Sequence, residues 1–296
     1  MKSVFYHHPV FEDFSLKAVG ESPSDLREYV DRRASGEFKF LGYPFDEPVY
    51  VVYGRDTENR NIEDLQLDRD WLESEIDSLS LLGRFVMYRL IELLEAAVDE
   101  RDSEGFNLYK ELQPRQIDNA LVHVDWGAML PTVAGDLMAN LILRHSLPNA
   151  NHRTAIAMLQ FCIEAVDGSF SMPRTHIDDD NWQEWVDPYI LDSKRLLTVR
   201  RNNVRFQKLV SLDVDGVTRK DGIEIRLSNY DLDMPFREAR SHYAKVHELH
   251  CRSFAVEVLD KAGRTDLTAE TGPTRDDLRT YLEVGVHKHE FTDVFS

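Results

Sequence analysis

The chain has 296 residues, of which 42% are hydrophobic and 10% aromatic, so it holds enough apolar side chains for a packed core. Its 53 acidic and 35 basic residues give a formal net charge of −18, which argues against general binding to the phosphate backbone of nucleic acids. No apolar run reaches the ~18 residues that a membrane span needs, and the first residues lack the apolar stretch of a signal peptide. Only two cysteines occur, Cys162 and Cys251, which excludes a disulfide framework. We therefore expect a reduced, cytoplasmic protein without a membrane partner.

The charged residues show a compositional bias. The chain has 25 arginines but only 10 lysines, and 30 aspartates but 23 glutamates. An acidic surface can simply keep a protein soluble and monomeric. It can also be an adaptation to high salt, and the scarcity of lysine resembles the composition of halophilic (haloarchaeal) proteins. We favour the second interpretation. It weakens the argument against nucleic acid, since concentrated salt screens exposed charges within a few ångströms.

The first 60 residues are expected to mix short extended pieces with turns. Residues 38–45 are rich in aromatic side chains, and residues 48–54 form a strand pattern that ends at Gly54. From about residue 60 the pattern becomes helical. Apolar residues recur at spacings of three and four over 71–99 and again over 132–144, which predicts two helices.

Residues 154–166 are apolar almost all round, which predicts a helix buried on every side. Asp167 and Gly168 form a helix-termination signal after it. Residues 167–188 are polar and contain two prolines, so we expect a loop there. Trp182 and Trp185 are expected to cover one end of the core.

The last third of the chain has a mixed pattern. Residues 206–214 and 223–227 have strand-like patterns, and the Asp-Gly pairs at 215–216 and 221–222 between them are turn signals. Residues 236–262 predict a helix that ends at Gly263, and Thr274 with Asp277 is suited to cap a last helix. The predicted organisation is an N-terminal mixed segment (1–60), a helical core (61–205), and a mixed β-hairpin and helix extension (206–296). The predicted fold class is mainly α, with a smaller mixed α/β extension.

The segment richest in chemistry is HSLPNANHRTA, residues 145–155, between two predicted helices. The backbone N–H groups at the start of the second helix form a favourable anion site, because they are unpaired and the helix dipole is positive there. Arg153 lies in that first turn and can bind a phosphate with two N–H groups. His145, across the loop, has the right ordinary pKa for a base near neutral pH. A base, an anion cradle and an arginine around one loop suit phosphate transfer.

A structural interpretation accounts equally well for these residues taken one at a time. A role as helix N-cap would be enough to explain Asn149. Arg153 can pair with one of the many acidic groups. His145 can be a surface residue near a helix C-terminus, where a partial positive charge is favourable.

As a whole, HSLPNANHRTA resembles the active-site motif of the Fic/Doc (Fido) family, H-x-F-x-[D/E]-[G/A]-N-[G/K]-R. The match is closest to the Doc-like branch, whose A-N-K-R-T-A differs from residues 150–155 only at His152. The resemblance covers about residues 70–200 and implies a Fido-type helical bundle with a central buried motif helix.

The resemblance also implies an activity and a role for each matching residue. The protein would transfer a phosphate or AMP group from ATP, or another nucleotide, to a hydroxyl side chain of a target protein. His145 would accept the hydroxyl proton. Ala150, Asn151, His152 and Arg153 would hold the phosphates, and Arg153 would also stabilise the charge that develops during transfer. The acidic position of the family, which binds Mg²⁺, is Asn149 here.

Four departures from the family pattern matter. Asn149 offers Mg²⁺ a neutral carbonyl oxygen and no charge, so the affinity for the metal should fall. Leu147 replaces the family phenylalanine and remains apolar. Ile156 replaces the second arginine of AMP-transferring members, and His152 replaces glycine or lysine. The last two changes favour Doc-like phosphate transfer, whereas Asn149 favours weak or absent catalysis.

The sequence gives weaker indications of how such an enzyme would be inhibited and how it would bind its target. Residues 24–28 match the start of the family's inhibitory-helix motif, but Tyr29 breaks its last position. Inhibition from within the chain is therefore unsupported, and a separate antitoxin protein remains a candidate partner of a toxin-like enzyme. Residues 123–129 are a candidate for the hairpin flap on which the family docks its targets, with a plain loop as the equal alternative.

Two other functions can be weighed against the transferase. A Fido-fold protein without catalysis would bind a nucleotide or a protein partner, and Asn149 favours it. A nucleic-acid-binding regulator could use residues 206–296, but Arg219, Lys220, Arg237 and Arg240 are too sparse in the sequence to predict a basic surface. His247, His250 and Cys251 share one predicted helix face, yet no paired Cys-x-x-Cys supports a zinc site.

Overall fold

The computed structural model describes residues 2–32, 36–55, 75–99, 113–144, 151–175 and 182–284. Over these residues the protein is mainly helical with a small portion of sheet, which agrees with the predicted mainly α fold class. The chain divides into two compact units. Unit 1 comprises residues 1–60 and 191–246, and unit 2 comprises residues 61–190 and 247–296.

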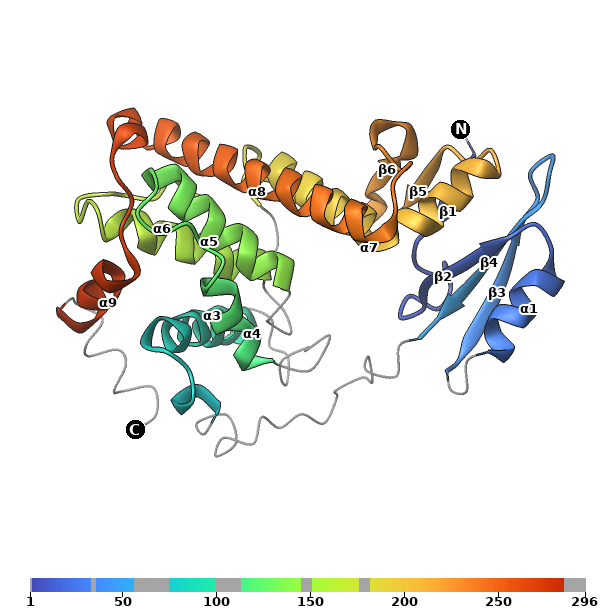
Figure 1. The fold of residues 1–296 in the computed structure, drawn as a ribbon, viewed down its shortest axis with the longest axis horizontal. Helices are drawn as coiled ribbons and strands as arrows, with labels where there is room; N and C mark the ends of the chain where they lie inside the picture. The colour runs from blue at the N-terminus through green and yellow to red at the C-terminus, as the bar shows by residue number, and fades with distance from the viewer. Residues whose placement is uncertain are drawn as a thin grey trace. The chain divides into compact units, whose positions relative to one another are not determined.

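Unit 1 contains an antiparallel sheet with the strand order β2-β4-β3 (Figure 1). Its strands are β2 (Ser15–Gly20), β3 (Phe38–Tyr43) and β4 (Val49–Gly54), and the last confirms the strand predicted from residues 48–54. The central strand β4 is almost entirely buried, with Val51, Val52 and Tyr53 at 0% exposure. Helix α1 (Pro23–Asp31), which the sequence patterns did not predict, contacts β2 and β4.

A second small sheet joins the start of the chain to residues more than two hundred positions later. Strand β1 (Ser3–Phe5) runs parallel to β5 (Gly216–Thr218), which pairs antiparallel with β6 (Glu224–Arg226). The hydroxyl of Tyr53 donates to the carbonyl of Phe5 at 2.7 Å, and that of Tyr43 accepts from the N–H of Phe5 at 2.9 Å. These bonds tie the two sheets together. Residues of both sheets share one hydrophobic core with residues of helices α7 (Asp187–Ser211) and α8 (Phe236–Lys261).

The strand predicted over residues 206–214 is wrong. These residues belong mainly to helix α7 (Asp187–Ser211), in which Val199, Phe206 and Leu209 are buried at helical spacing on one face. The chain turns after the helix at Asp213, whose φ is 57°, and the hairpin forms between β5 and β6 instead. Pro188, which we expected in a loop, lies in the first turn of α7, where its missing N–H costs nothing.

Unit 2 is a packed group of helices: α3 (Leu81–Asp99), α4 (Pro114–Leu121), α5 (Leu130–Arg144), α6 (Asn151–Glu164) and α9 (Arg275–Val284). Helix α6 contacts α5 and α3 (Figure 1). Eight of its residues between Thr154 and Ile163 are buried, which confirms that most of the helix predicted from residues 154–166 lies in the core. Ala157, Gln160 and Glu164 share one side of the helix and are only partly buried, so the helix is not buried on every side as predicted. Phe161 of α6 packs on Phe85 of α3 with 4.3 Å between the ring centroids.

Some helix ends depart from the sequence pattern. The helical run predicted over 71–99 is interrupted within its described part by a turn at residues 78–80, before α3 begins. The backbone N–H of Ser80 donates to the Asp118 carboxylate at 3.0 Å, and the Ser80 hydroxyl accepts from the N–H of Gly83 at 3.2 Å. Ser80 thus acts as an N-cap held in place by a carboxylate from α4, a contact that periodicity cannot predict.

The predicted ends of the last two helices are confirmed. Helix α8 (Phe236–Lys261) ends before Gly263, whose φ of 68° is the left-handed conformation that glycine tolerates. Thr274 and Asp277 form a reciprocal cap at the start of α9. The Asp277 N–H donates to the Thr274 hydroxyl at 3.1 Å, and the Thr274 N–H donates to the Asp277 carboxylate at 2.8 Å.

The three predicted segments are not each a separate body in the structure. Residues from the first and the third pair in the sheet β1-β5-β6, and both α7 and α8 contribute residues to unit 1 and to unit 2. Within the described ranges, no helix is long and apolar enough to cross a membrane.

Candidate functional site

The candidate phosphate site lies at the junction of α5 and α6. Helix α5 ends at Arg144 and α6 begins at Asn151. His145, Asn149 and Ala150 lie outside the described residues, so the predicted base and the predicted metal ligand have no described geometry. Asn151, His152 and Arg153 form the first turn of α6, and all three are half-buried.

Arg153 is oriented by an aromatic ring. Its guanidinium carbon lies 5.8 Å from the ring centroid of Trp182, within the range of a cation–π contact. Trp182 was expected only to cover the core, and its contact with Arg153 was not predicted.

Thr154 follows in the same turn and is completely buried. Its hydroxyl has no hydrogen-bond partner among the described residues. A helical threonine commonly donates to the carbonyl four residues earlier, which here is residue 150, outside the described part of the chain. The start of α6 therefore combines a half-buried cation with a buried hydroxyl.

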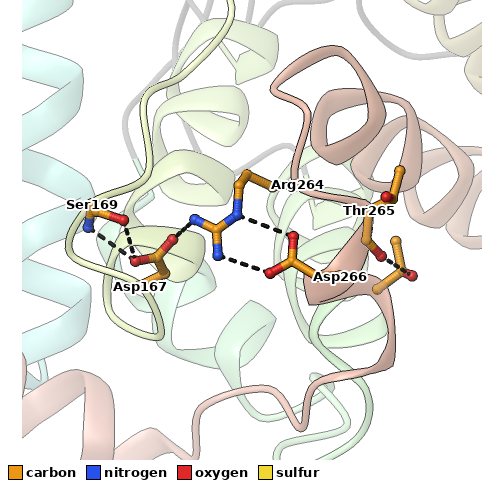
Figure 2. Close-up of polar contacts among 6 residues, drawn as sticks. Asp167, Ser169, Arg264, Thr265 and Asp266 are labelled. Atoms are coloured by element: carbon orange, nitrogen blue, oxygen red, sulfur yellow. Dashed lines mark hydrogen bonds and ion pairs between the residues drawn. The ribbon is translucent and has the colours of Figure 1, made fainter.

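The other end of α6 is fastened by a cluster of charged groups (Figure 2). Arg264, just after α8, donates to both carboxylate oxygens of Asp266, at 3.1 and 3.0 Å, and forms an ion pair with Asp167 beyond the end of α6. The same Asp167 carboxylate accepts from the backbone N–H of Ser169 at 3.1 Å. The predicted stop signal at Asp167 thus also fixes the end of the motif helix to the segment after α8.

A second ion pair holds α5 and was not found from the sequence. The side chain of Asp136 is 5% exposed and accepts two hydrogen bonds from Arg252 of α8, at 2.7 and 3.0 Å. A Cβ atom on the neighbouring Gly135 would lie 2.5 Å from the Cα of Arg252, so the two backbones require glycine at that point. The one feature of the sequence that could have indicated this ion pair is Gly135 followed by Asp136 inside an otherwise apolar helix.

The candidate flap at residues 123–129 is not a hairpin. It consists of turns after α4, and Gly127 has a φ of 83°. Met129 forms a single antiparallel bridge with Thr271, and the N–H of Leu130 donates to the carbonyl of Glu270 at 2.9 Å. Val122, Val124 and Trp126 alternate in the sequence as the residues of a strand do, but they lie in turns, where Val124 is buried and Val122 is 68% exposed.

His247, His250 and Cys251 lie together on α8 and engage neighbouring groups. The thiol of Cys251 lies 3.4 Å from the hydroxyl of Tyr189 and 3.6 Å from Nδ1 of His247. Burial raises the pKa of Cys251 to about 12, which keeps the sulfur protonated. Among the described residues, no three His, Cys, Asp or Glu side chains are arranged to hold a metal ion.

The protein is thus a mainly helical one, in which a buried helix carries the candidate phosphate site at its start. The chain belongs to the DUF8172 family, a family of unknown function, whose model matches residues 1–285. Comparison with curated proteins and with solved structures finds no significant match.

Proposed function

We propose that the protein is a Fido-type transferase that moves a phosphate or AMP group from ATP to a hydroxyl side chain of a target protein. The observation that carries the proposal is the coincidence of the motif HSLPNANHRTA with a helix junction. Three polar residues of the motif, Asn151, His152 and Arg153, form the first turn of a largely buried helix. This is the position in which backbone N–H groups and the helix dipole favour a phosphate.

The chemistry follows from the residue types. His145 would remove the proton from the acceptor hydroxyl as its oxygen attacks phosphorus. The bond from that phosphorus to the bridging oxygen of ATP would break, which releases ADP when the γ-phosphate is transferred and pyrophosphate when AMP is transferred. The N–H groups at the start of α6 and the side chain of Asn151 would hold the phosphates. Arg153, oriented by Trp182, would stabilise the negative charge that develops on the transferred group.

The donor set suits a nucleotide phosphate better than it suits Mg²⁺. Arg153 and Asn151 supply charged and neutral hydrogen-bond donors, whereas Asn149 supplies one neutral oxygen where divalent cations favour carboxylates. We therefore assign no step to the metal. Ile156 and His152 favour transfer of phosphate over transfer of AMP, and a toxin-like role with a separate antitoxin is consistent with the Doc-like motif.

A second candidate function is a Fido-fold protein that binds a nucleotide or a protein partner without transferring a group. The neutral Asn149 favours it, because lower metal affinity would slow transfer without preventing nucleotide binding. Both candidate functions predict nucleotide binding, but only the transferase predicts transfer of a group to the target protein.

The test uses ATP labelled at the α- or the γ-phosphate. The purified protein is incubated with extract of its own cells in high salt with Mg²⁺, alongside the variants His145→Ala and Arg153→Gln. Label from the γ-position that disappears in both variants supports phosphate transfer, and label from the α-position supports AMP transfer.

Calorimetry with ATP on the same samples separates the alternatives. ATP binding without label dependent on His145 would favour the binding protein. Absence of ATP binding by the wild type would contradict both candidate functions, as would ATP binding that Arg153→Gln does not weaken. Arg279→Gln, an exposed arginine of α9, is the matched control for loss of one positive charge.

A further inference from the structure

The acidic excess of the chain lies in one unit. Unit 1 has 20 Lys and Arg against 19 Asp and Glu, whereas unit 2 has 15 against 34. The net charge of −18 therefore describes unit 2 and not unit 1. The argument against phosphate binding that rests on the whole-chain charge does not apply to unit 1.

Unit 1 has a hollow of about 420 Å³ whose charged lining residues are all basic. Arg201, Arg205 and Lys208 follow one another on α7 at spacings of four and three, so they share one side of the helix. Lys17 of β2 completes the set. Four cations thus line one hollow of a chain that has very few lysines.

Arg205 of the hollow is positioned by neutral groups. Arg205 donates to the carbonyl oxygen of Lys17 at 2.7 Å and to the amide oxygen of Asn202 at 2.8 Å. Lys208 forms an ion pair with Glu21 at 2.8 Å, but both side chains are exposed, so the pair is weak and can be exchanged for another anion. Among the described residues, the charges of Arg205 and Lys208 are therefore only partly compensated.

Further cations extend beyond the hollow. Arg200 of α7 donates to the carbonyl oxygen of Arg240 at 3.0 Å, so the start of α8 adjoins α7. Arg237 and Arg240 of that first part of α8 are exposed. Arg237 and Arg240 were too sparse in the sequence to predict a basic surface. In the structure they lie on the part of α8 that adjoins the cations of α7.

Apolar side chains line the same hollow as these cations. Val204 and Phe236 are 50% and 45% exposed, and Tyr29 also lines the hollow. A ring exposed between cations is suited to stacking with an unpaired base, which a duplex does not offer. The exposed walls also favour an extended ligand over a small molecule, because small-molecule sites enclose most of the ligand surface.

We propose that this hollow of unit 1, with the adjoining cations of α8, binds single-stranded nucleic acid, with phosphates on Arg201, Arg205 and Lys208 and a base on Phe236. The interaction depends on backbone charge and stacking, so it is tolerant of sequence. It is independent of the proposed transferase site, whose residues belong to unit 2.

A second hollow of unit 1 supplies a matched control. It is lined by Arg226 together with four carboxylates, Asp213, Asp215, Asp231 and Asp233. Arg226 is exposed, like Arg201. Arg226→Gln and Arg201→Gln therefore remove the same charge from the same unit, one in an acidic hollow and one in the basic hollow.

The experiment measures fluorescence anisotropy of labelled DNA and RNA strands of about 12 nucleotides, a length within the usual range for single-strand sites. The full chain is used at the lowest salt that leaves its circular dichroism unchanged, and the salt is then raised. We expect binding that weakens with salt. We expect Arg201→Gln and Phe236→Ala each to weaken binding at least about fivefold, and Arg226→Gln to leave it unchanged.

Several outcomes would overturn the proposal. No binding by the wild type would do so, as would equal effects of Arg201→Gln and Arg226→Gln. Equal affinity for a duplex or for polyglutamate would assign the face to polyanions in general, and competition by free ATP at equal nucleotide concentration would assign it to a small ligand. Self-association at low salt that Arg201→Gln abolishes would assign it to a second, acidic copy of the chain.

Discussion

The two units differ in charge and in how their cores are assembled. Unit 1 is close to neutral, with 20 basic and 19 acidic residues, and its core combines strands near the N-terminus with helices about two hundred residues later. Unit 2 carries 34 acidic and 15 basic residues, and the contacts of α6 with α3 and α5 dominate its core. An average over the chain therefore describes neither unit. A property read from total charge, such as exclusion of nucleic acid, has to be judged for each unit.

The largest expected effects come from the two cores. Phe161→Ala in unit 2 and Phe206→Ala in unit 1 each remove a ring that is at most 2% exposed, and each should cost about 3–5 kcal/mol. All four tryptophans belong to unit 2, so their fluorescence follows that unit alone, whereas circular dichroism follows both. In denaturant titrations we expect Phe161→Ala to lower the fluorescence midpoint more than Phe206→Ala does. Equal shifts of both probes in both variants would mean that the units unfold as one cooperative body.

The next effect concerns the ion pair of α5. Arg252→Ala leaves the buried carboxylate of Asp136 without its bidentate partner and should cost about 3 kcal/mol of the free energy of unfolding. The double variant Arg252→Met with Asp136→Leu, which removes both charges, should recover much of that loss. Denaturant titration followed by tryptophan fluorescence measures both. A double variant less stable than Arg252→Ala would contradict a cost that arises from the unpaired charge.

Salt should separate the units by their charge. Raising the salt concentration screens the repulsion among the acidic residues of unit 2, so its fluorescence midpoint should rise. Unit 1, with almost no net charge, should gain less. Thermal unfolding at low and high salt, followed by fluorescence and by circular dichroism, measures the difference. Identical gains in both signals would indicate that the acidic excess does not govern the salt response.

The smallest expected effects are at helix caps. Thr274→Ala removes the cap of α9 and should cost about 1 kcal/mol, whereas Ser22→Ala at α1, where the bond is 3.3 Å long, should cost less. The hydrogen bonds from Thr274 lower the pKa of Asp277 below its ordinary value of 3.8. Their stabilisation is therefore present above that value and lost as the pH falls through the lowered pKa. The difference in stability between the wild type and Thr274→Ala, measured by denaturation, should shrink as the pH falls below 3.8. A difference that does not change with pH would contradict this role of Asp277.

Part of the candidate site could be predicted from local sequence. The period of residues 132–144 and the all-round apolarity of 154–166 were enough to predict α5 and α6. The segment between them, residues 145–150, lies outside the described residues. The contacts of Arg153 with Trp182 and of Asp136 with Arg252 join residues 29 and 116 positions apart. No local pattern encodes such pairs, because propensity and periodicity act over one or two helical turns.

The sequence alone determined the helical character of the centre, the burial of α6, the strand β4, and the caps of α8 and α9. Each depends on a few adjacent residues whose spacing or backbone preference is strong. Only the tertiary structure decided that residues 206–211 continue a helix and that β1 pairs with β5. It also decided that cations from β2 and α7 line one hollow. These features depend on apolar and charged side chains that meet across long stretches of chain, where burial against a partner outweighs local preference.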